Sequence, residues 1–296
     1  MCLLLVPGEL RGAVAVTDDA GNRIKLVRPA QRVIGLYGVF GEIFQAMGAG
    51  ELVVARTAAD VHDPALRDLP SVGTHMRPNL ELVVGLQPDL VLQMGGRRKA
   101  GESVAALRTH GVPTAMFQVR TVQDLFSVIE RLGVLTGTEK KARKLTRGMQ
   151  ADLKRIASRL HGLPSLPEVF FEVRYPNLLA AGRGSVVSDV IRLAGGQNCV
   201  TDRGKLVRFS EEQLIGLDPD VYLLQQGAMN PAPVPLQERS HFRTLTAVRL
   251  GAVYQVDEYL FSRPGPHLVR AVEQLARMLH PERFKDERSI AAGDIE

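Results

Sequence analysis

Polar side chains with binding chemistry follow directly after several short apolar runs of the chain. In chain order these side chains are Tyr37, Arg97 and Arg98, then Arg174 and Tyr175, and finally Gln226. Guanidinium groups pair with anionic oxygens, and phenols and amides add aromatic surface and further hydrogen bonds. The set therefore suits a polar, anionic ligand that has an aromatic or chelate component.

The apolar runs before these side chains have the length and spacing of strands in an α/β fold. Strands are predicted at 32–36, 52–55, 90–94 and 114–119, and again at 168–173, 221–225 and 252–256. Helices are predicted near 40–47, 79–86, 101–110 and 121–136, and then near 185–194, 210–217, 241–248 and 265–279. This alternation predicts mainly parallel sheets, whose ligands bind beyond the carboxyl ends of the strands.

The chain repeats one helix–turn–strand pattern half a protein apart. The segment NLELVVGLQPDLVLQ at 79–93 returns as SEEQLIGLDPDVYLLQ at 210–225, and matched positions lie 131 residues apart, as from Glu81 to Glu212. The segments GEIFQAMGAG and SDVIRLAGGQ, in each of which a predicted helix ends in glycine, precede the first and the second copy of this pattern. A length of 296 residues also exceeds what one core usually holds, so two similar α/β lobes are expected.

A long cationic helix is predicted between the two halves. Apolar residues recur there at every third or fourth position, Thr138 is a suitable N-cap, and Gly162 and Pro164 end the pattern. Two interpretations stay open: a rigid connector between two lobes, or one more helix packed on one domain. The predicted organisation is a first lobe at 1–137 with an arm or signal remnant at 1–13, a connecting helix at 138–163, a second lobe at 164–284 and a loosely ordered tail at 285–296.

Composition argues against several classes of protein. The net charge is +5, and the 37 basic residues alternate with 32 acidic ones without a basic tract interleaved with aromatics, so no nucleic-acid partner is expected. Cys2 and Cys199 form neither a disulfide framework nor a zinc motif. No apolar run reaches the ~18 residues that a membrane span needs.

Enzyme motifs are weak in this chain. The glycines of GLYGVFG do not have the dinucleotide-loop spacing, and AGRGS at 181–185 lacks the lysine of a phosphate-binding loop. The seven histidines lie far apart in sequence; His75, in a loop before the predicted helix at 79, is the best candidate for a site. No nucleophile–base pair stands out, so the chain is predicted to bind rather than catalyse, with no cofactor and no metal site of its own.

Seven segments, taken together, carry a family resemblance. They are RPAQRVIGL, EIFQAMGAGELVV, LPSVGTHMRPNLELVVGLQPDLVL, GVPTAMFQV, AAGRGSVVSDVIRLAGGQN, FSEEQLIGLDPDVYLL and SRPGPHLVRAVEQLARMLHP. In this order and spacing, over about residues 14–284, the chain resembles the substrate-binding proteins of ABC importers that carry ferric siderophores, haem and cobalamin. The resemblance implies two α/β lobes bridged by one long helix, a location outside the cytoplasmic membrane, either periplasmic or membrane-anchored, and a monomeric protein.

The resemblance also implies how the chain meets its partners. Glu81 and Glu212 would each lie in the first turn of a helix, capped by Asn79 or Ser210 respectively, and would each contact an arginine of the permease dimer. The alternative is two ordinary glutamates that stabilise helix starts. The arginines Arg97, Arg98, Arg174, Arg208 and Arg263 favour an anionic metal chelate such as a ferric siderophore. The absence of tryptophan disfavours large ring systems, but cobalamin, haem and an oxyanion stay open, as do a chelatase-like or nucleotide-dependent α/β enzyme and a soluble sensor.

Overall fold

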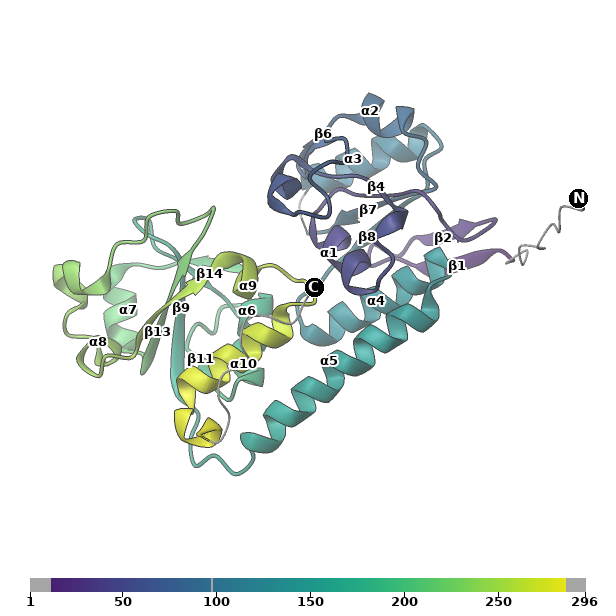
Figure 1. The fold of residues 1–296 in the computed structure, drawn as a ribbon. Coiled ribbons are helices and arrows are strands. Elements are labelled where there is room, and N and C mark those ends of the chain that lie inside the picture. Colours follow the sequence, from purple (N-terminus) through teal and green to yellow (C-terminus); the bar gives the residue numbers. More distant parts are fainter. Residues whose placement is uncertain (1–11, 97, 286–296) are drawn as a thin grey trace, which may run out of the picture. The chain divides into compact units, whose positions relative to one another are not determined.

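The computed structural model describes residues 12–96 and 98–285, which form two compact units (Figure 1). Unit 1 comprises the chain up to Gln118 and Phe126–Arg147, and unit 2 comprises Val119–Leu125 and the chain from Gly148 onward. The boundary therefore falls between Arg147 and Gly148, inside the long helix α5 (Glu139–Arg159). The predicted arm at 1–13 and tail at 285–296 lie almost wholly outside the described residues, and the connector role of α5 stays a prediction.

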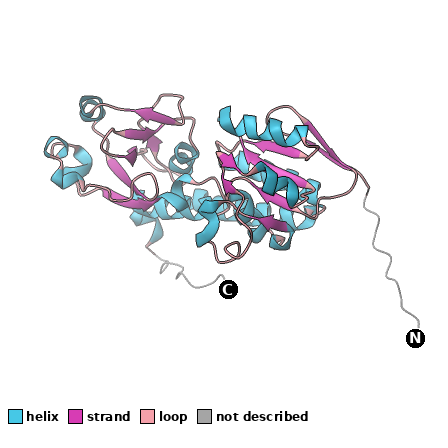
Figure 2. Ribbon diagram, turned by 90° about the horizontal axis from the view of Figure 1, so that it is seen from above, coloured by secondary structure: helices cyan, strands magenta, loops and turns pink. Residues whose placement is uncertain are grey.

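Unit 1 is built on a parallel sheet. Its strands lie in the order β4 (Val53–Ala55), β3 (Val33–Gly35), β7 (Leu90–Met94) and β8 (Thr114–Phe117). All three pairings are parallel, and nearly every strand residue is buried, as sheets covered on both faces require. Figure 2 shows helices on both sides of these strands.

The helices of unit 1 follow the predicted order closely. They are α1 (Val39–Ala46), α2 (Leu80–Gly85), α3 (Arg98–Thr109) and α4 (Val122–Thr136), whose first turn belongs to unit 2. Two hairpins were not predicted: β1 (Val14–Thr17) with β2 (Arg23–Leu26), and β5 (Gly73–Thr74) with β6 (Arg77–Pro78). Their strands are too short, and too exposed in part, to give a periodic apolar signal.

Unit 2 holds a mixed sheet. Its strands lie in the order β12 (Leu206–Arg208), β10 (Leu179–Ala181), β9 (Glu168–Arg174), β13 (Val221–Gln226) and β14 (Val253–Asp257), and β11 (Gln197–Asn198) also pairs with β9. The pairings β9–β13, β13–β14 and β9–β11 are parallel, whereas β10 pairs antiparallel with both β9 and β12. The prediction of two α/β lobes with mainly parallel sheets is confirmed, with an antiparallel edge that three-residue strands did not reveal.

The helices of unit 2 are α6 (Val186–Leu193), α7 (Glu211–Leu217), α8 (Thr246–Arg249), α9 (Glu258–Ser262) and α10 (Leu268–Leu279). The predicted start of the helix at 241–248 was wrong, because α8 begins at Thr246. Asp218 accepts hydrogen bonds from the Thr246 backbone N–H at 2.6 Å and from the Thr246 hydroxyl at 2.8 Å, which fixes the first turn of α8 at that residue. Residues 240–242 form a separate 3₁₀ turn.

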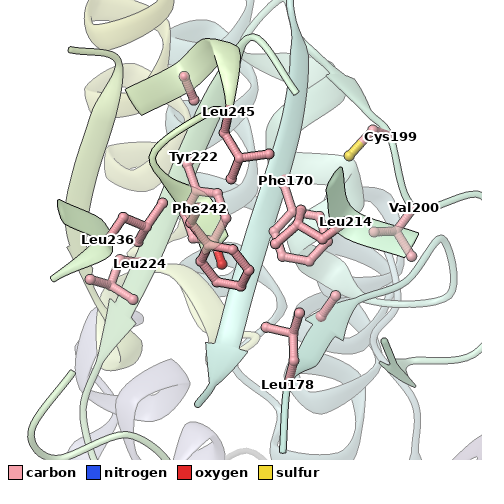
Figure 3. Close-up of a cluster of buried hydrophobic side chains, with 12 residues drawn as sticks. Phe170, Leu178, Cys199, Val200, Leu214, Tyr222, Leu224, Leu236, Phe242 and Leu245 are labelled. Carbon is pink, nitrogen blue, oxygen red and sulfur yellow. The ribbon is translucent and has the colours of Figure 1, made fainter. Parts of the chain in front are cut away.

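Aromatic side chains dominate the core beside the unit 2 sheet. Phe170 and Tyr222, from neighbouring strands, have ring centroids 5.2 Å apart, and Phe242, Leu236 and Leu245 pack in the same buried cluster (Figure 3). Burial of such rings contributes most of the packing energy of a core of this size. This cluster fixes the strand β9 and the loop that follows it, where ligand-binding side chains were predicted.

Candidate ligand-binding and docking residues

Two of the predicted ligand-binding residues of unit 1 lie together. Tyr37 follows β3, and His75 lies in the turn between β5 and β6; their rings meet edge to face, with centroids 5.5 Å apart and planes at 82°. Gln93, fully buried in β7, donates a hydrogen bond from Nε2 to the His75 carbonyl at 3.0 Å. Gln93 was missed, although an amide inside the apolar run LVLQM was the available signal.

Arg98 opens helix α3 and pairs with a neighbour on the same helix. Its guanidinium lies 2.6 Å from the Glu102 carboxylate, and both side chains are largely exposed. Pairs four residues apart on a helix surface contribute only a few tenths of a kcal/mol and exchange readily with water. Arg97 lies outside the described residues.

In unit 2 the end of strand β9 brings two predicted cations close in register. Leu179 of β10 pairs with Arg174 of β9 on one side and with Arg208 of β12 on the other. The two arginines therefore lie in register on the strands that flank β10, two strand spacings or about 10 Å apart. Neither guanidinium has a hydrogen-bond or ion-pair partner among the described residues. Arg174 and Arg208 therefore form a small cationic patch at this end of the sheet.

Tyr175, next to Arg174, turns toward its own lobe. Its hydroxyl donates to Glu211 Oε1 at 3.0 Å, and the Arg239 guanidinium covers the ring at 3.8 Å from the centroid. The ring also meets Phe242 edge-on, with centroids 6.1 Å apart. The phenol is therefore held by protein on several sides.

Arg239 is held in turn by a buried carboxylate. Glu172, fully buried in β9, accepts hydrogen bonds from Arg239 at 2.5 and 3.0 Å and from the Tyr222 hydroxyl at 2.5 Å. Burial, together with nearby Glu172, raises the pKa of Tyr222 well above its ordinary value. Burial and the hydrogen bond to Glu211 likewise raise the pKa of Tyr175, so both phenols stay protonated as donors.

The remaining predicted residues lie after β13 and β14. Gln226 ends β13, is exposed, and accepts a hydrogen bond from Gln255 of the neighbouring strand. Arg263 lies over the Tyr259 ring at 4.9 Å, and the Tyr259 and His267 rings stack with centroids 4.8 Å apart. His267 was not among the predicted residues; its spacing of four residues from Arg263 was the signal.

Glu81 and Glu212 occupy equivalent positions in the two units. Each is the second residue of a short helix, α2 or α7, and each is exposed. The preceding caps are those predicted: the Asn79 side chain accepts from Leu82 N–H at 3.0 Å, and the Ser210 side chain accepts from Gln213 N–H at 3.2 Å. Hydrogen bonds from its own backbone N–H and from Ser210 lower the pKa of Glu212, which is a full negative charge at neutral pH.

Within residues 12–96 and 98–285, no group of three His, Cys, Asp or Glu side chains is arranged to hold a metal ion. In the same part of the chain, no helix has the length and apolar character that crossing a membrane requires.

Comparison with known proteins gives consistent matches over most of the chain. A model of the family described as periplasmic binding protein matches residues 33–260. The ABC transporter substrate-binding lipoprotein YvrC of Bacillus subtilis is 28% identical over 275 residues, which are 91% of this chain and 86% of that protein. A cobalamin-binding protein of Halobacterium salinarum is 27% identical over 279 residues, or 90% of this chain and 74% of that protein.

A solved structure supports the same fold. The periplasmic heme-binding protein RhuT from Roseiflexus sp. RS-1, in apo form, aligns with a TM-score of 0.71 and 23% identity, covering 86% of this chain and 99% of that chain.

Proposed function

We propose, from the premise that the chain belongs to the periplasmic binding protein family, that it carries a tetrapyrrole metal chelate, with cobalamin as the first candidate. The coarser role follows from the family and its relatives: the protein is an extracytoplasmic substrate-binding protein of an ABC importer, and it is not an enzyme. Its partners are a small-molecule ligand and a permease. The YvrC relative is a lipoprotein, which supports membrane anchoring for this chain as well.

The observation that carries the choice of ligand is a tyrosine–histidine ring pair in each unit. Tyr37 and His75 meet in unit 1, and Tyr259 and His267 stack in unit 2. The chain has only five tyrosines and no tryptophan, so two of its few large rings lie beside histidines. Aromatic faces suit a planar macrocycle, and imidazole is a common ligand for its metal. The cobalamin-binding relative supports the same class.

A ferric siderophore is the second candidate. Arg174 and Arg208 lie on the two strands that flank β10, and neither has an anionic partner among the described residues. Two such guanidinium groups favour a ligand with carboxylate or other anionic oxygens. This candidate makes the arginines, rather than the rings, the main contacts.

Ligand binding separates the two candidates. We expect cyanocobalamin or haemin, at about a hundred times its dissociation constant, to stabilise the protein by ~2.7 kcal/mol in thermal unfolding. His75→Ala and His267→Ala should each weaken that binding about tenfold, whereas His110→Ala, at an exposed position, should not. Stabilisation by a ferric siderophore alone, lost in Arg174→Ala, would select the second candidate, and no stabilisation by any of these ligands would reject the metal-chelate assignment.

Docking to the permease is proposed to use Glu81 and Glu212. Reversing both to arginine places like charges against the cations expected on the permease, which costs several kcal/mol, so uptake should fall at least about tenfold. Ligand affinity of the isolated protein should stay unchanged. Glu238→Arg, also at an exposed position, is the matched control. Wild-type uptake by the double variant would remove both glutamates from the docking surface.

A further inference from the structure

Tyr175 connects two parts of unit 2 that have different predicted partners. It follows Arg174 in the loop after β9, where ligand contacts are proposed. Its hydroxyl donates to Glu211 Oε1 at 3.0 Å, and Glu211 is the first residue of α7, directly before Glu212. One hydrogen bond therefore joins the ligand-side loop to the first turn of the helix that carries the docking carboxylate.

The tyrosine end of this hydrogen bond is rigid. The Arg239 guanidinium lies 3.8 Å from the ring centroid, and Arg239 is itself held by both oxygens of the buried Glu172. Phe242, part of the aromatic core in Figure 3, closes another side of the ring. Because the ring is fixed by these contacts, its hydroxyl can fix Glu211 in turn.

The helix that accepts this hydrogen bond, α7, is short and has few buried contacts. Helix α7 has seven residues, and Leu214 is its fully buried side chain. A capping box between Ser210 and Gln213 holds its start, but Glu212 and Gln213 are exposed. Helices of this length are marginal without tertiary contacts, so the contact from Tyr175 matters for where Glu212 lies.

The repeat shows that this contact is not a general requirement of the fold. Position 211 of unit 2 corresponds to Leu80 of unit 1 at the same spacing of 131 residues, and a leucine cannot accept a hydrogen bond. Helix α2 nevertheless forms with its cap and its exposed glutamate. The tyrosine–carboxylate contact is thus an addition to one lobe.

We propose that Tyr175 and Glu211 act as positioning residues that hold Glu212 in the orientation the permease binds. The proposal rests on the docking role of Glu212 given above. It assigns Tyr175 a task distinct from ligand contact: the phenol fixes the first turn of α7, and the loop that follows Arg174 shares this fixed point. Permease binding through this lobe then depends on a half-buried hydrogen bond at the residue next to Glu212.

The test measures binding of the ligand-free protein to its permease dimer in lipid nanodiscs, together with hydrogen exchange of α7. Tyr175→Phe keeps the ring and removes only the hydroxyl; it should weaken docking about tenfold and speed amide exchange in α7 but not in α2. Glu211→Ala should have the same two effects. Glu211→Gln, which still accepts the hydrogen bond, should stay near wild type. The double variant Tyr175→Phe with Glu211→Ala should lose no more docking affinity than either single variant.

Each result bears on one proposal. Unchanged exchange of α7 in Tyr175→Phe overturns the positioning role, and so does faster exchange with wild-type docking. The docking assignment is tested separately by Glu212→Arg: if that variant binds the permease as wild type does, the proposed function of Glu212 fails, whatever the exchange data show. Melting temperatures of the variants close to wild type establish that the comparison is between folded proteins.

Discussion

Glu172 is the centre of a buried polar cluster in unit 2. Its side chain is fully buried, and its two oxygens accept hydrogen bonds from Arg239 and Tyr222. A buried charge is tolerated only when its partner and hydrogen bonds remain in place. Removing either member of the ion pair leaves the other charged, desolvated and without compensation.

Glu172→Gln should therefore lower the free energy of unfolding by about 3–5 kcal/mol, because Arg239 loses its counter-charge inside the protein. Urea denaturation followed by circular dichroism measures this loss. Glu102→Gln is the matched control: it breaks the exposed pair with Arg98 and should cost less than ~1 kcal/mol. Equal losses in the two variants would contradict the central role of the buried pair.

Cys199 gives a second test at the scale of the residue. Burial raises the pKa of its thiol to about 12. With Cys2 replaced by serine, the folded protein should resist thiol reagents at pH 8 and react fully in urea, which absorbance of the released thiolate would measure. Since the unfolded thiol ionises near ~8.5, the folded chain holds a proton that the unfolded chain releases, and stability should decrease above that pH. Prompt reaction in the folded state would show that Cys199 is open to solvent.

At the scale of elements, the repeated segment places an equivalent aspartate in each unit, Asp89 or Asp220. Each aspartate directly precedes one strand, and its side chain holds the start of the adjacent strand. Asp89 Oδ2 accepts the backbone N–H groups of Gln31 and Arg32, just before β3, at 2.8 and 3.0 Å. Asp220 Oδ2 accepts the Glu168 N–H, the first of β9, at 2.8 Å. In both units the turn also passes through a left-handed residue, Gln87 with φ 50° and Asp218 with φ 42°. The motif therefore joins a short helix, a turn and the adjacent strand into one unit.

Asp89→Ala and Asp220→Ala should each lower the free energy of unfolding by about 1–2 kcal/mol, with the larger loss for Asp89, which accepts two backbone hydrogen bonds. Amide exchange of Gln31, Arg32 and Glu168 should increase in the respective variants. Asp68→Ala, at a side chain that is 92% exposed in its ion pair, provides the comparison. Protection of these amides in the variants would show that the strand starts are held by other contacts.

At the scale of the whole molecule, helix α5 is the longest helix among the described residues, and both units contain part of it. The boundary between the units lies at Arg147 and Gly148, and apart from the adjacent residues and the nearby helix backbone, no atom of the described residues lies within 4 Å of a Cβ built on Gly148. A glycine inside a helix costs about 0.5–1 kcal/mol relative to alanine, and proline there removes a hydrogen bond and clashes with the preceding turn.

Gly148→Ala should accordingly raise the free energy of unfolding by about 0.5–1 kcal/mol, and Gly148→Pro should lower it by about 3 kcal/mol. Urea denaturation measures both values, and uptake assays show whether transport needs the continuous helix. Gly162→Ala is the contrasting variant, because φ is 71° at Gly162 and alanine there should destabilise. A destabilised Gly148→Ala would mean that α5 needs flexibility at its middle.

Much of the fold could be read from residues close together in sequence. Apolar runs such as 90–94 and 221–225 became β7 and β13 within a residue of the predicted ends, and Asn79 and Ser210 cap the helices they were expected to cap. The sequence by itself determined the alternation of helices and strands and the duplication, because hydrophobic period, caps and turns act over a few residues. The proposed docking pair came from the family resemblance.

The tertiary structure decided what depends on residues far apart in the chain. Only folding brings Arg239 onto Tyr175, sets Tyr175 against Glu211, and pairs Tyr37 with His75. Such contacts follow from strand order and core packing, which no local pattern encodes, so the sequence identified the loops and the structure identified which side chains each loop holds in place.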